Sequence, residues 1–71
     1  MRNQYFTIQI NGEPFHCMNQ MSLNNVLSYL EIDLSFSLVE YNNEIIPDDK
    51  LQQIFVENND KVEIITIVGG G

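Results

Sequence analysis

The amino-acid sequence predicts a single α+β domain in which one main helix packs on one face of a mixed β-sheet. Three observations support this class. Apolar and polar residues alternate over residues 4–10, as in a half-buried strand, and an unbroken strand-like run over residues 62–68 belongs to a final strand predicted at 61–68. Between these segments, apolar residues recur at clear helical spacing after Ser22. The chain has 71 residues, which is enough for one small hydrophobic core and one domain.

The first two predicted strands form a hairpin. The apolar residues of 4–10 occupy even positions and therefore share one face of the strand. Asn11-Gly12 follows directly and is a strong signal for a tight hairpin turn. Residues 14–18 then return as the second strand, with Pro14 at its start, where a missing N–H is tolerated.

The predicted helix begins after Ser22, a favourable N-cap residue, and presents one apolar stripe made of Leu23, Val26, Leu27 and Leu30. A third strand over residues 36–41 and a fourth at 45–46 flank a turn containing Asn42 and Asn43, which tolerate a positive φ. Residues 48–54 are interpreted as one irregular helical turn, and residues 57–60 as the last turn before the final strand.

The predicted order is therefore β-β-α-β-β-β. A helix with one apolar stripe needs a sheet face to cover. Because the first and last strands are the most continuously hydrophobic, we expect them side by side at the centre of the sheet, which is a β-grasp arrangement. Residues 1–68 would form this domain. Gly69, Gly70 and Gly71 would form a mobile tail that has no side chains to pack.

Charge and cysteine content limit the functions open to the chain. Ten acidic residues against three basic ones give a net charge of −7, which argues against nucleic acid and anionic membrane surfaces and favours partners with basic faces. No apolar run is long enough to span a membrane. Cys17 is the only cysteine, so an internal disulfide is excluded and a reducing compartment is expected. We expect a cytoplasmic protein, or one of the plastid stroma, since abundant Asn and Ile suggest an AT-rich genome.

The glycine tail is the main candidate for a functional site. An ionised carboxylate at Gly71 is a poor electrophile, so chemistry there requires prior activation, for example by adenylation in a partner's site. A fraying end without function is the alternative interpretation of the three glycines.

These features together resemble the ThiS family of ubiquitin-like sulfur carrier proteins of thiamine biosynthesis. The resemblance spans the whole chain and depends on the element order, the stretch Asn42-Asn43-Glu44-Ile45-Ile46-Pro47 and the terminal Gly70-Gly71. Three positions depart from the family pattern: Asp48 stands where Arg is frequent, Leu51 where an aromatic residue is frequent, and Asn59 where Gly is usual. The Asp48 difference puts in doubt any partner contact that the family makes through a basic residue there.

The resemblance implies a mechanism. An E1-like partner would use ATP and Mg²⁺ to adenylate the Gly71 carboxylate, and the chain itself would bind no cofactor. A sulfur donor, such as a cysteine desulfurase, would displace AMP and leave a thiocarboxylate. A thiazole synthase would then take the sulfur. The catalytic groups would belong to these partners, so this chain would be a carrier and co-substrate and not an enzyme. The small subunit of molybdopterin synthase and a ubiquitin-like modifier joined to proteins through Gly71 are the alternatives, and an interaction domain with an inert tail is a further one.

The final strand offers a candidate docking surface for such partners. Val62, Ile64 and Thr66 share one face, so the other face carries Glu63, Ile65 and Ile67. If the first face packs on the helix, the second is exposed beside Val68 and the glycine tail, and an exposed aliphatic cluster often marks a docking site. A strand shielded on both faces is the alternative.

Other side chains carry weaker signals. Cys17 and His16 are neighbours in a strand and therefore point to opposite faces, which rules out a shared metal site and favours a buried, structural Cys17. No metal site is expected elsewhere. The acidic residues could form either a solvated face or a docking face for a basic partner; they are Asp48, Asp49, Glu57, Asp60 and Glu63.

Overall fold

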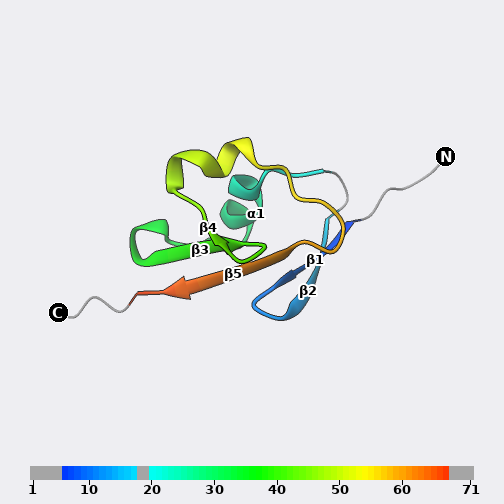
Figure 1. The fold of residues 1–71 in the computed structure, drawn as a ribbon, viewed down its shortest axis with the longest axis horizontal. Coiled ribbons are helices and arrows are strands. Elements are labelled where there is room, and N and C mark those ends of the chain that lie inside the picture. The colour runs from blue at the N-terminus through cyan, green and yellow to red at the C-terminus, as the bar shows by residue number, and fades with distance from the viewer. Residues whose placement is uncertain (1–5, 18–19, 68–71) are drawn as a thin grey trace.

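The computed structural model describes residues 6–17 and 20–67 of the chain. These residues form five strands, one α-helix and two 3-10 helices, and Figure 1 shows how the elements are arranged. The strands are β1 (Phe6–Ile10), β2 (Glu13–Cys17), β3 (Ser37–Tyr41), β4 (Glu44–Ile45) and β5 (Lys61–Thr66). The helix α1 spans Leu23–Tyr29, and the 3-10 helices span Leu34–Phe36 and Asp48–Gln53. The predicted order of the main elements is confirmed.

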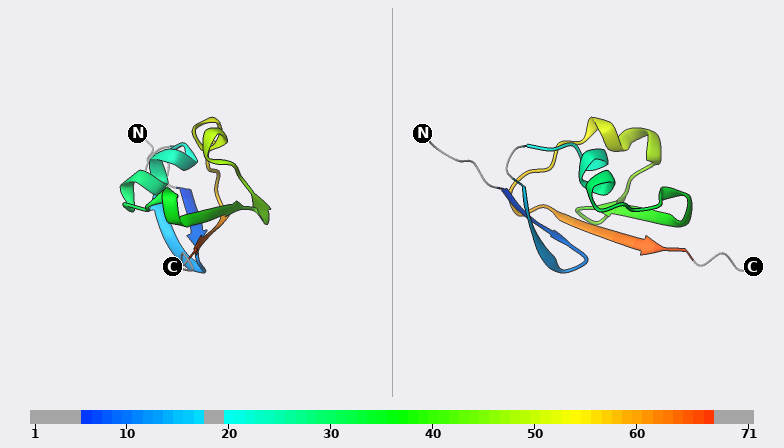
Figure 2. Two further views of the ribbon diagram at one scale, coloured as in Figure 1. Left: turned by 90° about the vertical axis from the view of Figure 1, so that its left-hand side faces the viewer. Right: turned by 180° about the vertical axis from the view of Figure 1, so that it is seen from behind.

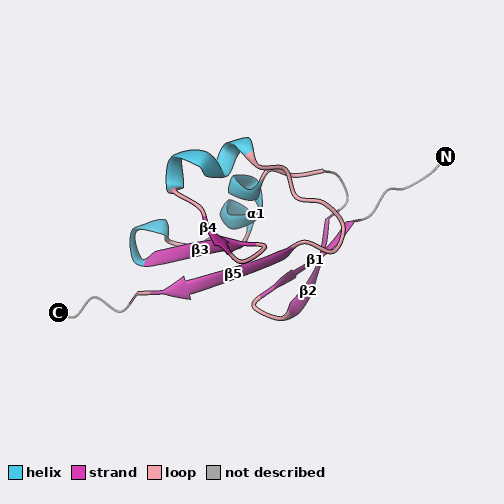
Figure 3. Cartoon of the chain, in the orientation of Figure 1, coloured by secondary structure: helices cyan, strands magenta, loops and turns pink. Residues whose placement is uncertain are grey.

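The strands form one mixed sheet in the order β2-β1-β5-β3-β4 (Figure 3). β1 and β5 lie side by side at the centre and are parallel, whereas the other neighbouring pairs are antiparallel. This is the arrangement expected from the hydrophobic first and last strands, and it confirms the β-grasp prediction. The edge strands are β2, which contains Pro14, and the two-residue β4.

Asparagine shapes the turns. Asn11, Asn42, Asn43 and Asn59 all have positive φ, between 50° and 74°. Asparagine tolerates this conformation better than most residues that carry a Cβ, which also explains why Asn59 can stand where the family usually has Gly. The side chain of Asn42 also takes part in the pairing, since its Oδ1 accepts a hydrogen bond from the backbone N–H of Lys61 at 2.9 Å.

The core lies between the sheet and the layer formed by α1 and the Asp48–Gln53 segment, which cover the same face (Figure 2). Ser22 caps the helix, accepting a hydrogen bond from the N–H of Asn25 at 3.0 Å. Nine hydrophobic residues from all these elements are fully buried: Ile8, Cys17, Leu23, Val26, Leu27, Val39, Leu51, Val56 and Val62. The predicted helix stripe therefore faces the core. No described helix has the length and apolar character needed to cross a membrane.

The 3-10 helix Leu34–Phe36 was not expected from the sequence. The Asp33 side chain caps this turn by accepting a hydrogen bond from the N–H of Ser35 at 3.0 Å. Three residues are too few to produce a periodic apolar pattern, so only the capping side chain could have signalled the turn. The turn directly precedes β3, which starts at Ser37, one residue later than predicted.

Candidate functional site

The two faces of β5 differ in exposure. Val62 is fully buried and Ile64 packs against the core from the helix-covered face. On the opposite face, Ile65 is 43% exposed, and Ile67, just beyond the strand, is 46% exposed. The alternative of a strand shielded on both faces is therefore wrong. The predicted docking residues lie on the open face of the sheet, opposite α1.

Neighbouring strands enlarge this exposed surface. Leu38 of β3 lies directly across from Ile65 and is 40% exposed. Ile45 of β4 lies across from Glu40 on the same face and is 58% exposed. We call this surface the open-face patch and define it by Leu38, Ile45, Ile65 and Ile67 together with Glu40 and Glu63. Exposed aliphatic side chains gathered at one place are typical of a docking surface.

Sequence reasoning missed half of the open-face patch. The three missed residues, Leu38, Glu40 and Ile45, belong to predicted strands. The local sequence does not show that they lie on the same face of the sheet as Ile65. The alternation of Leu38 and Glu40 with the buried Val39 was the available signal. It becomes informative only once the pairing register between β3 and β5 is known.

Two carboxylates face each other within the open-face patch. Glu40 of β3 and Glu63 of β5 are directly opposed in the antiparallel pairing, and both are half-buried. Like charges in this position destabilise a sheet, so their placement side by side is not explained by stability. They give the patch an acidic centre among apolar neighbours, which fits a partner surface that carries basic and apolar groups.

The other half of the open face is polar. There β1 and β2 present Thr7, Gln9, Pro14 and His16, and Thr7 Oγ1 lies 3.0 Å from His16 Nδ1 in a hydrogen bond. Exposed aliphatic side chains are therefore concentrated on the half formed by β3, β4 and β5. That half contains the strand that leads into the tail (Figure 1). The predicted partner-binding residues Val68, Gly69 and Gly70, and the predicted reactive residue Gly71, lie outside the described residues.

One of the acidic residues considered for a docking face, Asp60, has a structural role. The Asp60 carboxylate is a structural acceptor, taking hydrogen bonds from the Tyr41 hydroxyl, the Asn42 side-chain amide and the backbone N–H of Glu57. Burial, followed by this hydrogen bond to Asp60, raises the pKa of Tyr41 above its usual value. Asp60 thus ties the turn before β5 to the end of β3 and is not free for docking.

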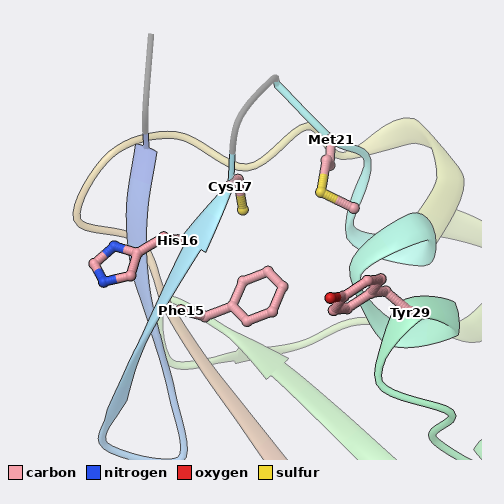
Figure 4. A pocket seen from close by; sticks show the side chains of 5 residues that line it. All are labelled: Phe15, His16, Cys17, Met21 and Tyr29. Atoms are coloured by element: carbon pink, nitrogen blue, oxygen red, sulfur yellow. The ribbon is translucent and has the colours of Figure 1, made fainter. Parts of the chain in front are cut away.

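A separate cavity of about 270 Å³ lies between β2 and α1. Figure 4 shows the Phe15 and Tyr29 rings facing each other there, with Cys17 and Met21 beside them, whereas the His16 imidazole points away. Burial raises the pKa of the Cys17 thiol, which disfavours the nucleophilic thiolate. The predicted burial of Cys17 is confirmed. Within residues 6–17 and 20–67, no three His, Cys, Asp or Glu side chains come close enough together to hold a metal ion.

The fold and the open-face patch define the class of protein, which is a small ubiquitin-like β-grasp domain whose final strand leads to a terminal glycine tail. The particular family follows from a family model: residues 8–71 match the ThiS family, and the chain belongs to it. Proteins of this family are small carriers, and membership supports a role as sulfur carrier in thiamine biosynthesis.

Individual relatives agree with this assignment. The chain is 44% identical to an uncharacterized protein named ycf40 from Porphyra purpurea and 41% identical to its namesake from Pyropia yezoensis, in both cases over the full length of both chains. It is 37% identical, over 87% of its length, to 19% of a thiazole synthase from Paramagnetospirillum magneticum. The crystal structure of the thiamine biosynthesis protein ThiS from Geobacter metallireducens superposes with a TM-score of 0.80, at 25% identity, covering 93% of this chain and all of that one.

Proposed function

We propose that this protein is a sulfur carrier whose C-terminal Gly71 carboxylate is converted to a thiocarboxylate for thiazole formation in thiamine biosynthesis. The observation that carries the proposal is the combination of ThiS-family membership with the run Gly69-Gly70-Gly71 directly after the strand that bears the open-face patch. Because glycines have no side chains, a glycine segment is narrow enough to carry the acyl carbon into a confined active site.

The chemistry requires activation before sulfur transfer. An E1-like enzyme would bind ATP and Mg²⁺ and join AMP to the Gly71 carboxylate, releasing pyrophosphate. A sulfur donor, such as a cysteine desulfurase acting through a persulfide, would then displace AMP. A thiol would then cleave the S–S bond of the resulting acyl disulfide, which leaves the thiocarboxylate on Gly71 and a new disulfide between the thiol and the donor cysteine. The chain itself contributes the carboxylate and the docking surface, while the catalytic groups and the nucleotide belong to its partners.

The thiamine pathway is favoured over molybdopterin by one specific similarity. A stretch amounting to 19% of a protein named thiazole synthase matches most of this chain. A carrier-like segment within the same polypeptide as the sulfur-accepting enzyme is expected if the two act together, since fusion raises their effective concentration. We therefore propose a thiazole synthase as the acceptor.

We place the protein in the plastid stroma or in the cytoplasm. The full-length ycf40 relatives and the abundance of residues with A/T-rich codons support a plastid location. The single buried cysteine fits a reducing compartment.

Intact-mass measurement tests the proposal. The chain is incubated with ATP, Mg²⁺, the adenylating enzyme from the same genome and a sulfur donor. We expect a mass increase equal to the exchange of one oxygen for sulfur, and loss of that change when Gly71 is deleted. Attachment of the chain to other proteins would identify a modifier instead. An unchanged mass with every adenylating enzyme of that genome would overturn the proposal.

A further inference from the structure

Within residues 6–17 and 20–67, one side of β5 has no neighbouring strand over the second half of its length. β1 pairs with β5 only at Gln9/Lys61 and Ile10/Val62, whereas β3 pairs along β5 from Val62 to Thr66. Figure 1 shows β5 continuing past the β1–β2 hairpin toward the C-terminal end. Among the described residues, no strand accompanies β5 on the β1 side after Val62.

The backbone hydrogen bonds of β5 show which groups face this side. Backbone groups of successive strand residues point alternately to the two sides. The Lys61 carbonyl accepts from Asn42 N–H at 2.7 Å and the Ile67 N–H donates to the Phe36 carbonyl at 2.7 Å, so odd-numbered residues of β5 face β3. Even-numbered residues therefore face the β1 side.

Asn11 marks where the protection of this edge ends. The Val62 carbonyl accepts a hydrogen bond from Asn11 N–H at 2.9 Å, and the Ile64 N–H donates to Asn11 Oδ1 at 2.7 Å. Beyond this side-chain contact, the alternation directs the Ile64 carbonyl and both the N–H and the carbonyl of Thr66 to the open side. These groups form a short unpaired edge immediately before the tail.

The sheet protects its two outer edges but not this one. β2 carries Pro14, and β4 is only two residues long with Pro47 shortly after it. Prolines and short strands are the usual means of preventing edge pairing. In contrast, Ile64, Ile65 and Thr66 are strong strand formers without proline or charge. An unpaired edge of this composition is a template for another chain.

We propose that an extended segment of the adenylating enzyme adds to this edge as a further strand, pairing with the backbone of Ile64 and Thr66. This rests on the proposed function. Two arguments select that occupant. A glycine tail offers only backbone groups for recognition, so an enzyme that guides it must read amides and carbonyls, beginning at the strand that precedes it. The added strand also lies beside Ile65 and extends the open-face patch, giving one continuous docking surface.

Amide hydrogen exchange of the full chain tests this without any substitution. In the free protein, the Thr66 amide should exchange faster than the amides of Ile64 and Ile67, which already have partners. In a saturated complex with the adenylating enzyme, without nucleotide, we expect Thr66 exchange to slow at least tenfold. Thr66 exchange that stays unchanged in the complex would overturn the inference.

Two substitutions at one position provide a binding test. Thr66→Pro removes the N–H on the open side and no group that faces β3, and we expect it to weaken enzyme binding about tenfold or more. Thr66→Val keeps the N–H and the side-chain shape and should bind within about twofold of the wild type. Thermal unfolding checks that both variants fold. If Thr66→Pro does not fold, the hydrogen-exchange experiment on the wild-type chain decides whether the inference holds.

Each outcome separates this inference from the proposed function. A wild-type chain that no adenylating enzyme of its genome modifies defeats the proposed function. A wild-type chain that is adenylated, with Thr66→Pro folded and bound equally well, defeats only the edge inference. Sedimentation analysis of the chain alone tests whether a second copy of the chain occupies the edge instead. A wild-type dimer that dissociates in the Thr66→Pro variant would show this and would overturn the assignment to the enzyme.

Discussion

The two faces of β5 carry similar residues with opposite roles. Ile64 packs against the core beneath α1, whereas its neighbour Ile65 is exposed on the open face beside Leu38. The side chains are identical, and only the two-residue period of the strand and the single covering layer separate them. The comparison shows that hydrophobicity alone does not distinguish core from docking surface in a two-layer domain.

The largest expected effect comes from the covered face. Leu27 is 1% exposed in the centre of the helix stripe, so Leu27→Ala should lower the free energy of unfolding by about 2–5 kcal/mol. A domain of this size has only a few kcal/mol of stability, and much of the variant should unfold near physiological temperature. Chemical denaturation measures the change. An unaltered midpoint would show that this face is not the main core.

Ile65→Ala tests the open face. Truncating an exposed anchor should weaken binding to the adenylating enzyme by about 2 kcal/mol, while the free energy of unfolding changes by about 0.5 kcal/mol or less. Titration calorimetry and thermal unfolding measure the two effects. Ile64→Ala is the matched control and should show the reverse pattern, with reduced stability and normal binding per folded molecule. Unfolding of the Ile65→Ala variant would instead show that Ile65 is part of the core.

Tyr41→Phe tests the hydrogen bond that ties the end of β3 to the turn before β5. Loss of the hydroxyl leaves the Asp60 carboxylate one partner short and should cost about 1–2 kcal/mol of unfolding free energy. Urea denaturation of both proteins near neutral pH measures it. No loss of stability would show that the hydroxyl is equally well solvated in the unfolded chain.

The same pair predicts a pH dependence. The pKa of Tyr41 is raised in the folded state, first by burial and then by the Asp60 hydrogen bond, so the folded chain keeps a proton that the unfolded chain loses. This stabilisation is complete below the unfolded tyrosine pKa of about 10 and falls as the pH rises above it. Tyr41→Phe should show a weaker decline in the same alkaline range.

The smallest expected effect concerns the two opposed carboxylates of the open-face patch. Glu63→Gln removes one of two directly opposed carboxylates and should raise the free energy of unfolding by about 0.2–1 kcal/mol, most clearly at low salt. Binding to a basic partner surface should become weaker and less salt-dependent. Melting curves at two ionic strengths measure the first effect, and a destabilised Glu63→Gln variant would contradict the idea that the two carboxylates repel each other.

The sequence by itself determined the fold class and most of the elements. Local signals were sufficient where a side chain acts on its own backbone, as at the Asn11-Gly12 turn and the Ser22 cap, both of which are confirmed. Periodicity identified the helix stripe through Leu27 and the two faces of β5, because burial of one face imposes a repeat on the sequence. The short 3-10 turn before β3 had too few residues to show a repeat.

Tertiary structure decided the register and the extent of the strand pairing and which face of β5 is covered. The alternation of β5 could say that Ile65 and Val62 face opposite ways, but only packing of α1 on one face made Ile65 the exposed one. The open-face patch and the unpaired edge at Thr66 both depend on register with β3 and on how far β1 extends. Register joins residues distant in sequence through backbone hydrogen bonds common to all residue types, and no local side-chain pattern encodes those bonds.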